Sequence, residues 1–350
     1  MTISLRQSMY LALAVFAAVL LTAAPFASAQ GSRALRGKVV IDGSSTVYPV
    51  SEAVASAFRK HFPNVKVTVA VSGTGGGFKR FVVGETDISN ASRPMKFEEF
   101  KQAAANGVEF IEIPVALDGL TIVVSPDNDW VDALTVEQLR KIYLAESAAK
   151  TWKELDPSWP DRPIKVYSPG TESGTFDYFH EVMGEDAALR SDMATSEDDN
   201  VLVTGVQRDK YAIGYFGASY YYNNEDKLKA VAIVNPDSGE AVLPTEENVK
   251  GGSYVPFARP LFIYVSKKAL TRPEVKVFCD YYLREADKMA TKVDYVPLSE
   301  SMYERVGDIY RARRTGTTYL TADGEKRAGR LPEVYQKENL LKLTDIEVDE

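Results

Sequence analysis

Asp42-Gly43-Ser44-Ser45-Thr46 marks the point where an apolar, strand-like run, Lys38–Asp42, turns directly into a segment with helical spacing. Two further bursts rich in Gly, Ser and Thr stand at the same kind of junction, Ser72–Gly77 and Ser168–Thr175. The first turn of a helix presents unpaired backbone N–H groups and the positive end of the peptide dipole, and small hydroxyl residues let an anion approach both. Three such junctions together predict a cage for an oxyanion.

Strand-like and helix-like periods alternate on both sides of these bursts. Val47–His61 places apolar residues at helical spacing, and Val65–Val71 alternates apolar and polar residues as a strand does. After the glycines of the second burst, we expect the next helix to begin at Phe78. This alternation predicts an α/β architecture with largely parallel sheets. In the second half of the chain the same patterns predict strand Ile164–Tyr167, helix Phe176–Met183, helix Val201–Arg208 and strand Tyr211–Phe216.

The first 29 residues have the pattern of a cleaved export signal. Arg6 is their one charge, Leu11–Leu21 is apolar, and Ala27-Ser28-Ala29 supplies the small residues of a cleavage site. We therefore expect cleavage after Ala29 and a periplasmic protein; the alternative is an N-terminal membrane anchor, although the apolar run is short for a span. Removing the signal moves the formal net charge from −8 to −9 because Arg6 leaves with it. An acidic chain argues against a nucleic acid partner, so a bound anion must be held by local dipoles and hydrogen bonds.

Two apolar runs, Val108–Pro114 and Leu120–Ser125, flank the sequence Ala116-Leu117-Asp118-Gly119. They form either one long strand or a strand that crosses between two lobes, and Arg259–Val265 could be the strand that returns to the first lobe. About 320 residues remain after the signal, which suits two domains of about 150 residues each. We predict one lobe from residues 35–117 plus 257–350 and a second lobe from residues 118–256.

One cysteine and two histidines limit the sites that this chain can build. Cys279 is expected to be a buried small apolar residue of a helix, and a single cysteine excludes a disulfide within the chain. So few soft ligands argue against a structural zinc site, and we expect neither a metal nor another cofactor. Ser173 and His180 invite a hydrolase interpretation, but seven positions along one helix separate them by roughly 10 Å. We therefore predict that the protein is not an enzyme.

The first two bursts also have simpler interpretations. Ser44–Thr46, just before Pro49, could be an ordinary helix cap, and Gly73–Gly77 could be a flexible connector. The second burst is not a P-loop, because Phe78 separates its last glycine from Lys79.

Charged neighbours complicate the third burst. Ser173-Gly174-Thr175 could offer several donors to one tetrahedral anion, but Glu172 stands next to it and would have to pair with a cation such as Arg93. Arg93 follows Ser92 in a polar turn, and its planar fork of donors suits a bidentate contact with an oxyanion. A surface salt bridge is an equal alternative for this arginine.

Segments that cover most of the chain after the signal match one family in that family's order: Asp42–Pro49, Ser72–Lys79, Gly84–Pro94, Ser173–Thr175, Tyr211–Phe216 and Arg259–Tyr264. These segments resemble the signatures of the phosphate-binding proteins of Pst ABC importers. The resemblance implies a two-lobe periplasmic-binding-protein fold of type II, in which each lobe is a mixed, mostly parallel sheet flanked by helices and two hinge strands join the lobes. It implies a monomer that captures inorganic phosphate between the lobes and delivers it to the transmembrane subunits of an ABC permease.

The resemblance also implies phosphate ligands from all three bursts. Carried over position by position, these are Ser45, Thr46, Thr74, Gly75, Ser173, Gly174 and Thr175.

Two positions depart from the family pattern. Better-known members have an aspartate where this chain has Ser92, which accepts the proton of bound phosphate, and an arginine where this chain has Pro169. We expect Arg93, with Ser92 beside it, to replace the missing cation. For the proton acceptor we propose Asp118 at the lobe crossing, with its role as a turn residue as the alternative and Glu172 as the next candidate.

Other functions stay open at this point. A protein of the same build could bind sulfate, molybdate or tungstate, and a secreted phosphatase or an additional sensing role would also use an anion cage. The absence of a metal cluster and of a positioned nucleophile in the sequence pattern argues against the phosphatase.

Overall fold

The computed structural model describes residues 34–346 apart from 172, 185 and 197. The predicted export signal at residues 1–29 and Glu172 lie outside the described residues. None of the described helices combines the length and the apolar composition that a membrane span requires.

Most strands of the described chain join one nine-stranded sheet with the order β2-β1-β3-β12-β4-β8-β6-β7, in which β9 also pairs with β4. The strands at both ends pair in parallel, β2-β1-β3 at one end and β8-β6-β7 at the other. The central pairs, β3-β12, β12-β4 and β4-β8, are antiparallel. The bounds are β1 Gly37–Gly43, β2 Val65–Val69, β3 Ile88–Ala91, β4 Phe110–Val124, β6 Lys165–Pro169, β7 Ala194–Ser196, β8 Ala212–Gly217, β9 Lys229–Ala230 and β12 Ala258–Ser266.

A smaller three-stranded sheet has the order β11-β10-β5. Its strands are β5 Ala133–Leu134, β10 Ala232–Val234 and β11 Ala241–Val242.

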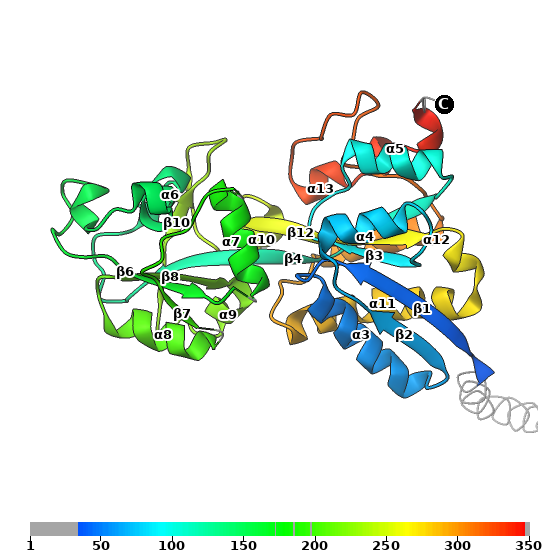
Figure 1. The fold of residues 1–350 in the computed structure, drawn as a ribbon, viewed down its shortest axis with the longest axis horizontal. Coiled ribbons are helices and arrows are strands. Elements are labelled where there is room, and N and C mark those ends of the chain that lie inside the picture. The colour runs from blue at the N-terminus through cyan, green and yellow to red at the C-terminus, as the bar shows by residue number, and fades with distance from the viewer. Residues whose placement is uncertain (1–33, 172, 185, 197, 347–350) are drawn as a thin grey trace, which may run out of the picture.

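β4 and β12 connect the two ends of the large sheet. Every residue of the 15-residue β4 is buried, which explains its continuous apolar sequence. The first part of β4 pairs with β12, and Leu120–Val124 pairs with β8. The two apolar runs of the sequence are therefore one strand that also crosses between lobes, and the predicted return strand is β12. Figure 1 shows two bodies joined by these strands.

We call the body that contains β1, β2 and β3 the first lobe and the body that contains β6, β7 and β8 the second lobe. The helices of the first lobe are α3 Tyr48–His61, α4 Gly73–Phe81, α5 Phe97–Ala105, α11 Pro273–Lys292, α12 Glu300–Arg311 and α13 Leu331–Val334. Those of the second lobe are α6 Val136–Tyr143, α7 Gly174–Gly184, α8 Asp199–Arg208, α9 Ala218–Tyr222 and α10 Glu246–Gly251. This mixed sheet flanked by helices is the predicted α/β, two-lobe fold.

Aromatic side chains form the centre of each lobe. In the first lobe, the rings of Phe58 on α3 and Phe278 on α11 meet edge to face at 5.2 Å between centroids. In the second lobe, Phe179 on α7 stacks on Tyr215 of β8 at 4.0 Å. Cys279 on α11 is buried and free, as predicted from its apolar surroundings.

The start of α4 corrects the expected helix boundary. The helix begins at Gly73, so the glycines of the second burst form its first turns and are not a loop ahead of Phe78. Glycine is unfavourable inside a helix, which is why the pattern suggested a loop. Tertiary contact decides the matter, because a Cβ on Gly77 would lie 2.5 Å from the Cα of Gly43. The absence of side chains lets α4 lie directly against β1.

The polar segment after Arg314 folds onto the first lobe. Glu112 of β4 is 2 % exposed and accepts hydrogen bonds from Thr317 Oγ1 at 2.6 Å and from the Thr318 amide at 2.9 Å. Tyr335 donates its hydroxyl to the Glu112 carbonyl at 2.7 Å. Burial raises the pKa of Glu112, and the threonine hydroxyls oppose that rise. The segment is thus held by the buried carboxylate of Glu112, which lies far from it in the sequence.

Candidate anion site at the junction of the lobes

The first and second bursts lie side by side. Gly43 pairs with Asn90 of β3, and the Ser44 amide donates to the Asn90 carbonyl at 3.0 Å. The Ser72 amide donates to the Gly43 carbonyl at 3.1 Å, and Gly77 packs on Gly43 from the other side. The two turns therefore share one edge of the first lobe, because they follow β1 and β2, which are parallel neighbours in the sheet.

The first burst leaves amides available at the start of α3. Ser44 Oγ accepts a hydrogen bond from the Val47 amide at 3.4 Å, and Pro49 lies in the first turn of the helix. The amides of Ser45 and Thr46 make no hydrogen bond to another described residue. Ser45 is exposed, whereas Thr46 is 3 % exposed. The burst therefore begins a helix as a cap does, and it also leaves backbone N–H donors that an anion could use.

The third burst comes from the second lobe and meets the first. α7 begins at Gly174, and the Thr175 amide donates to Ser173 Oγ at 3.2 Å. A Cβ on Gly174 would lie 3.4 Å from Thr46 Oγ1. The start of α7 thus touches the start of α3 across the boundary between the lobes.

Ser92 and Arg93 join this junction from the end of β3. Ser92 Oγ lies 3.0 Å from Thr74 Oγ1, and the Ser92 amide donates to the same hydroxyl at 3.2 Å. Arg93 lies next to Gly75, whose Cβ would be 4.0 Å from Arg93 Nη2. Its guanidinium forms a bidentate pair with Glu99 of α5, at 2.8 and 2.9 Å. The salt bridge that was the alternative for Arg93 is therefore present, at the side of the proposed cage.

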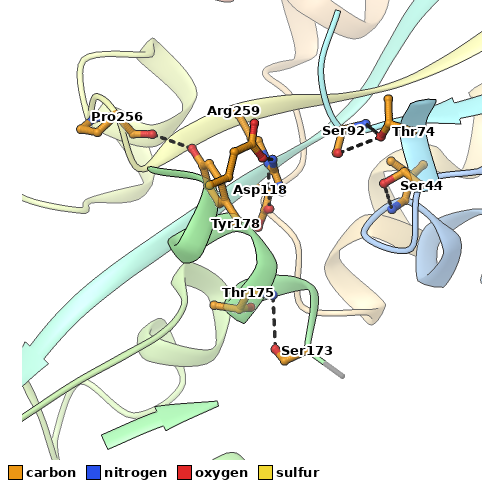
Figure 2. A network of polar contacts seen from close by, with 11 residues as sticks. Ser44, Thr74, Ser92, Asp118, Ser173, Thr175, Tyr178, Pro256 and Arg259 are labelled. Carbon is orange, nitrogen blue, oxygen red and sulfur yellow. Dashed lines mark hydrogen bonds and ion pairs between the residues drawn. The ribbon is translucent and has the colours of Figure 1, made fainter. Parts of the chain in front are cut away.

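Asp118 lies on β4 directly opposite Arg259 of β12. Asp118 is 3 % exposed, and Arg259 Nε is 3.3 Å from its Oδ2. Burial raises the pKa of Asp118 to about 6, and the charge of Arg259 opposes that rise. Figure 2 shows this pair in view between Ser92 and Thr74 on one side and Ser173 and Thr175 on the other.

Arg259 is a residue that the sequence analysis placed only in a strand motif. Its Nη1 donates to Glu181 Oε2 of α7 at 2.6 Å, and its guanidinium lies 3.7 Å from the ring centroid of Tyr178. Tyr178 in turn donates its hydroxyl to the Pro256 carbonyl at 2.6 Å (Figure 2). The sequence holds one signal for this role of Arg259. It is the one cation of the apolar return strand and stands at the start of that strand, where the chain crosses between the lobes.

A cavity of about 720 Å³ lies beside these residues, between the two lobes. Ser92, Arg93, Glu181 and Arg259 contribute to its wall. The other predicted ligands, all within the described chain, are not part of that wall. Ser92, which contacts Thr74, and Arg93, which lies next to Gly75, therefore connect the second burst to the wall of the cavity.

The hydrolase interpretation finds no support in the contacts of its two residues. His180 Nε2 lies 2.7 Å from the Ala187 carbonyl, and Ser173 Oγ is engaged by the Thr175 amide. Within the described residues, no group of histidine, cysteine and carboxylate side chains is placed to hold a metal ion.

Comparison with known proteins identifies the family of this chain. A family model described as a PBP superfamily domain matches residues 28–286. Protein SphX of Synechococcus elongatus is 48 % identical over 309 residues, which cover 87 % of this chain and 91 % of that protein. Phosphate-binding protein PstS of Staphylococcus saprophyticus is 42 % identical over 268 residues, 76 % of this chain and 82 % of that protein. The chain belongs to the PstS/SphX family of the PBP superfamily.

Solved structures of this family share the fold. A possible phosphate binding protein from Planctomyces limnophilus is 42 % identical, with a TM-score of 0.77, and the match covers 80 % of this chain and 99 % of that chain. A substrate-binding protein assigned to phosphate ABC transport in Clostridium perfringens, solved with bound phosphate, is 33 % identical with a TM-score of 0.50, covering 75 % and 100 %. The PstS relatives are named as binding proteins, not as enzymes. The fold is therefore the type II periplasmic-binding-protein fold expected from the sequence motifs.

Proposed function

We propose that this PstS/SphX family member captures inorganic phosphate at the junction of its three Gly/Ser/Thr-rich turns and delivers it to an ABC permease. The contact of Gly174 with Thr46 carries the proposal, because it brings the helix starts of both lobes to one point. The relatives named for phosphate binding support the choice of ligand.

Uncharged donors supply most of the cage. The free amides of Ser45 and Thr46, the first turn of α4 and the first turn of α7 all present N–H groups at the junction. Such groups bind an anion inside an acidic chain without attracting it by net charge. The proposed ligands carried over from the family are Ser45, Thr46, Thr74, Gly75, Ser173, Gly174 and Thr175. Arg93, with Ser92 beside it, replaces the cation that the family has at another position.

Asp118 is our candidate for the group that recognises the proton of hydrogen phosphate. Its ionised carboxylate can accept that proton, whereas sulfate, which has no proton at neutral pH, would present a bare oxygen to it. An unpaired buried contact of this kind costs about 1–3 kcal/mol or more, which favours phosphate. Arg259 holds the carboxylate in place from the opposite strand.

The proposal extends to the lobe boundaries, the hinge and the export of the chain. We take residues 35–117 plus 257–350 as one lobe and 118–256 as the other, with β4 and β12 as the hinge, so that ligand binding couples to closure. We also propose that residues 1–29 are an export signal cleaved after Ala29 and that the mature protein acts as a periplasmic monomer without catalysis.

Calorimetric titration of the mature protein with phosphate and with sulfate tests the function. We expect phosphate to bind and sulfate to bind much more weakly at neutral pH. Arg93→Gln should weaken phosphate binding by about tenfold, a loss of about 1.4 kcal/mol. A preference for sulfate would contradict the phosphate assignment, and an unchanged affinity in Arg93→Gln would show that this arginine is structural.

A further inference from the structure

Each lobe contributes one wall of the cavity between them. One wall is a hairpin at residues 319–330, which we call the C-terminal hairpin; Leu320 bridges to Lys326, and the Arg327 amide donates to the Tyr319 carbonyl at 2.8 Å. The other wall includes the turn between β10 and β11 and the end of α10 in the second lobe. Figure 1 shows both segments above the hinge strands, the turn on the second lobe and the hairpin on the first.

The C-terminal hairpin is fixed to the first lobe at several points. Thr317 and Thr318 bind the buried Glu112, just before the hairpin begins. The ring of Tyr319 meets Phe262 of β12 edge to face at 5.4 Å. At the tip, a Cβ on Gly324 would lie 2.6 Å from the Phe97 ring of α5. The hairpin must therefore move with the first lobe.

The hairpin also reaches the second lobe. Gly252, which ends α10 with a φ of 72°, packs against Arg330: a Cβ at that position would lie 3.0 Å from Arg330 Cβ. Arg330 with Gly252 is therefore a contact between the lobes, in addition to Thr46 with Gly174 and Arg259 with Glu181. Residues of two of these contacts, Arg330 with Gly252 and Arg259 with Glu181, line the cavity.

The unpaired charges on the two walls are opposite in sign. Lys326 and Arg327 on the hairpin form no ion pair with another described residue, and neither do Asp237 and Glu240 on the β10–β11 turn. By contrast, the neighbouring cations Lys250 and Arg330 pair with carboxylates of their own helices or turns. Lys326 and Arg327 thus line the cavity from the first lobe, and Asp237 and Glu240 line it from the second lobe, without an ion pair within the described chain.

We propose that Lys326 and Arg327 form an interlobe latch with Asp237 and Glu240, which stabilises the closed state of the ligand-bound protein. The inference rests on the proposed phosphate-coupled closure. Closure narrows the cavity and brings the two pairs of charges together, and each pair then adds a modest electrostatic contribution at the rim of the cleft. The latch acts from outside the proposed cage, so it changes how long phosphate is held and not which anion is recognised.

A charge-reversal cycle tests the latch. Three variants, K326E/R327E, D237K/E240K and the quadruple variant, are titrated with phosphate at low ionic strength, and phosphate release is followed by stopped flow. We expect each double reversal to weaken binding by about threefold to tenfold through faster release, and the quadruple variant to recover most of the loss. K326E alone should show the same sign with a smaller effect.

The main competing explanation is that the cations of the hairpin simply attract phosphate. It predicts opposite effects of the two double variants on phosphate affinity. If the cations only attracted phosphate, K326E/R327E would weaken binding while D237K/E240K strengthened it, and that result would overturn the latch. Additive effects in the quadruple variant would overturn it as well. Failure of the unmodified protein to bind phosphate would instead contradict the proposed function.

A matched control removes the effect of net charge. Lys38 and Lys66 are exposed neighbours on β1 and β2, outside the cavity wall, and carry no ion pair within the described chain. K38E/K66E changes the net charge as much as K326E/R327E does. We expect it to leave phosphate release unchanged, and an equal acceleration of release would overturn the latch.

Discussion

Arg259 has contacts that join both hinge strands to the second lobe. It pairs with Asp118 across the β4–β12 ladder and with Glu181 on α7, and it lies over the Tyr178 ring. Because Asp118 is buried, loss of the arginine leaves a carboxylate without its cation, which typically costs about 3–5 kcal/mol.

We therefore expect Arg259→Gln to lower the free energy of unfolding by about 3 kcal/mol and to weaken phosphate binding. Urea unfolding and calorimetry measure the two effects. Arg311→Gln is a suitable control, because Arg311 pairs with the exposed Asp308 on its own helix, α12, so its loss leaves no buried carboxylate without a cation. Equal stability of Arg259→Gln and the unmodified protein would show that the hinge does not depend on this cation.

Asp118 should give the protein a distinctive pH dependence. Burial raises the pKa of Asp118 from 3.8 to about 6, so the folded state holds this proton more tightly than the unfolded state. The resulting stabilisation is fully present below about pH 4 and is lost as the pH rises through 6. This rise of the Asp118 pKa to about 6 corresponds to about 3 kcal/mol of stability.

Urea unfolding of the unmodified protein and of Asp118→Asn between pH 4 and pH 7 tests this prediction. The variant lacks the ion pair with Arg259 at every pH, which lowers its free energy of unfolding by a constant amount. Any change with pH in the difference between the two free energies of unfolding therefore reports the titration of Asp118. We expect the unmodified protein to lose about 3 kcal/mol relative to the variant over that range. A pH-independent difference would contradict the raised pKa.

At the scale of single elements, the packing of α4 on β1 positions two of the three turns. Gly77 contacts Gly43, and a Cβ there would also approach Ser89 Oγ to 2.9 Å. We expect Gly77→Ala to destabilise the protein by about 1–3 kcal/mol and to weaken phosphate binding, because α4 must move away from the first burst. Differential scanning calorimetry and titration measure both quantities.

Gly251→Ala is the control for this substitution. Gly251 lies in α10, and a Cβ there would meet no atom within 4 Å. The helix propensity of alanine should make this variant neutral or slightly more stable. If Gly77→Ala were as stable as Gly251→Ala, the close approach of α4 and β1 would not be required.

These elements also show what could be read from the sequence. The alternation of strand and helix periods predicted the α/β fold, and the family motifs marked the turns that the structure brings together. The start of α4 was predicted too late, because local propensity cannot register that Gly77 needs no side chain against Gly43. Arg259 and the C-terminal hairpin were missed as parts of the junction, since their positions depend on long-range pairing with Asp118 and Glu112.

At the scale of the whole molecule, two strands carry the connection between the lobes. β12 has a register shift against β4 between Leu261 and Phe262, close to the pairing of Arg259 with Asp118. An irregularity in an otherwise continuous ladder lets the strands bend locally, which suits a hinge between rigid bodies.

Small-angle X-ray scattering should therefore show that the radius of gyration falls when phosphate is added and does not change with sulfate. The same phosphate addition should stabilise the fold by about 2.7 kcal/mol at a free concentration one hundred times the dissociation constant. The K326E/R327E variant should still contract with phosphate, because the cage and the hinge are intact, but it should need a higher phosphate concentration for half of the change. If phosphate bound without a decrease in the radius of gyration, binding would not be coupled to closure of the lobes. The hinge strands would then only connect the two lobes.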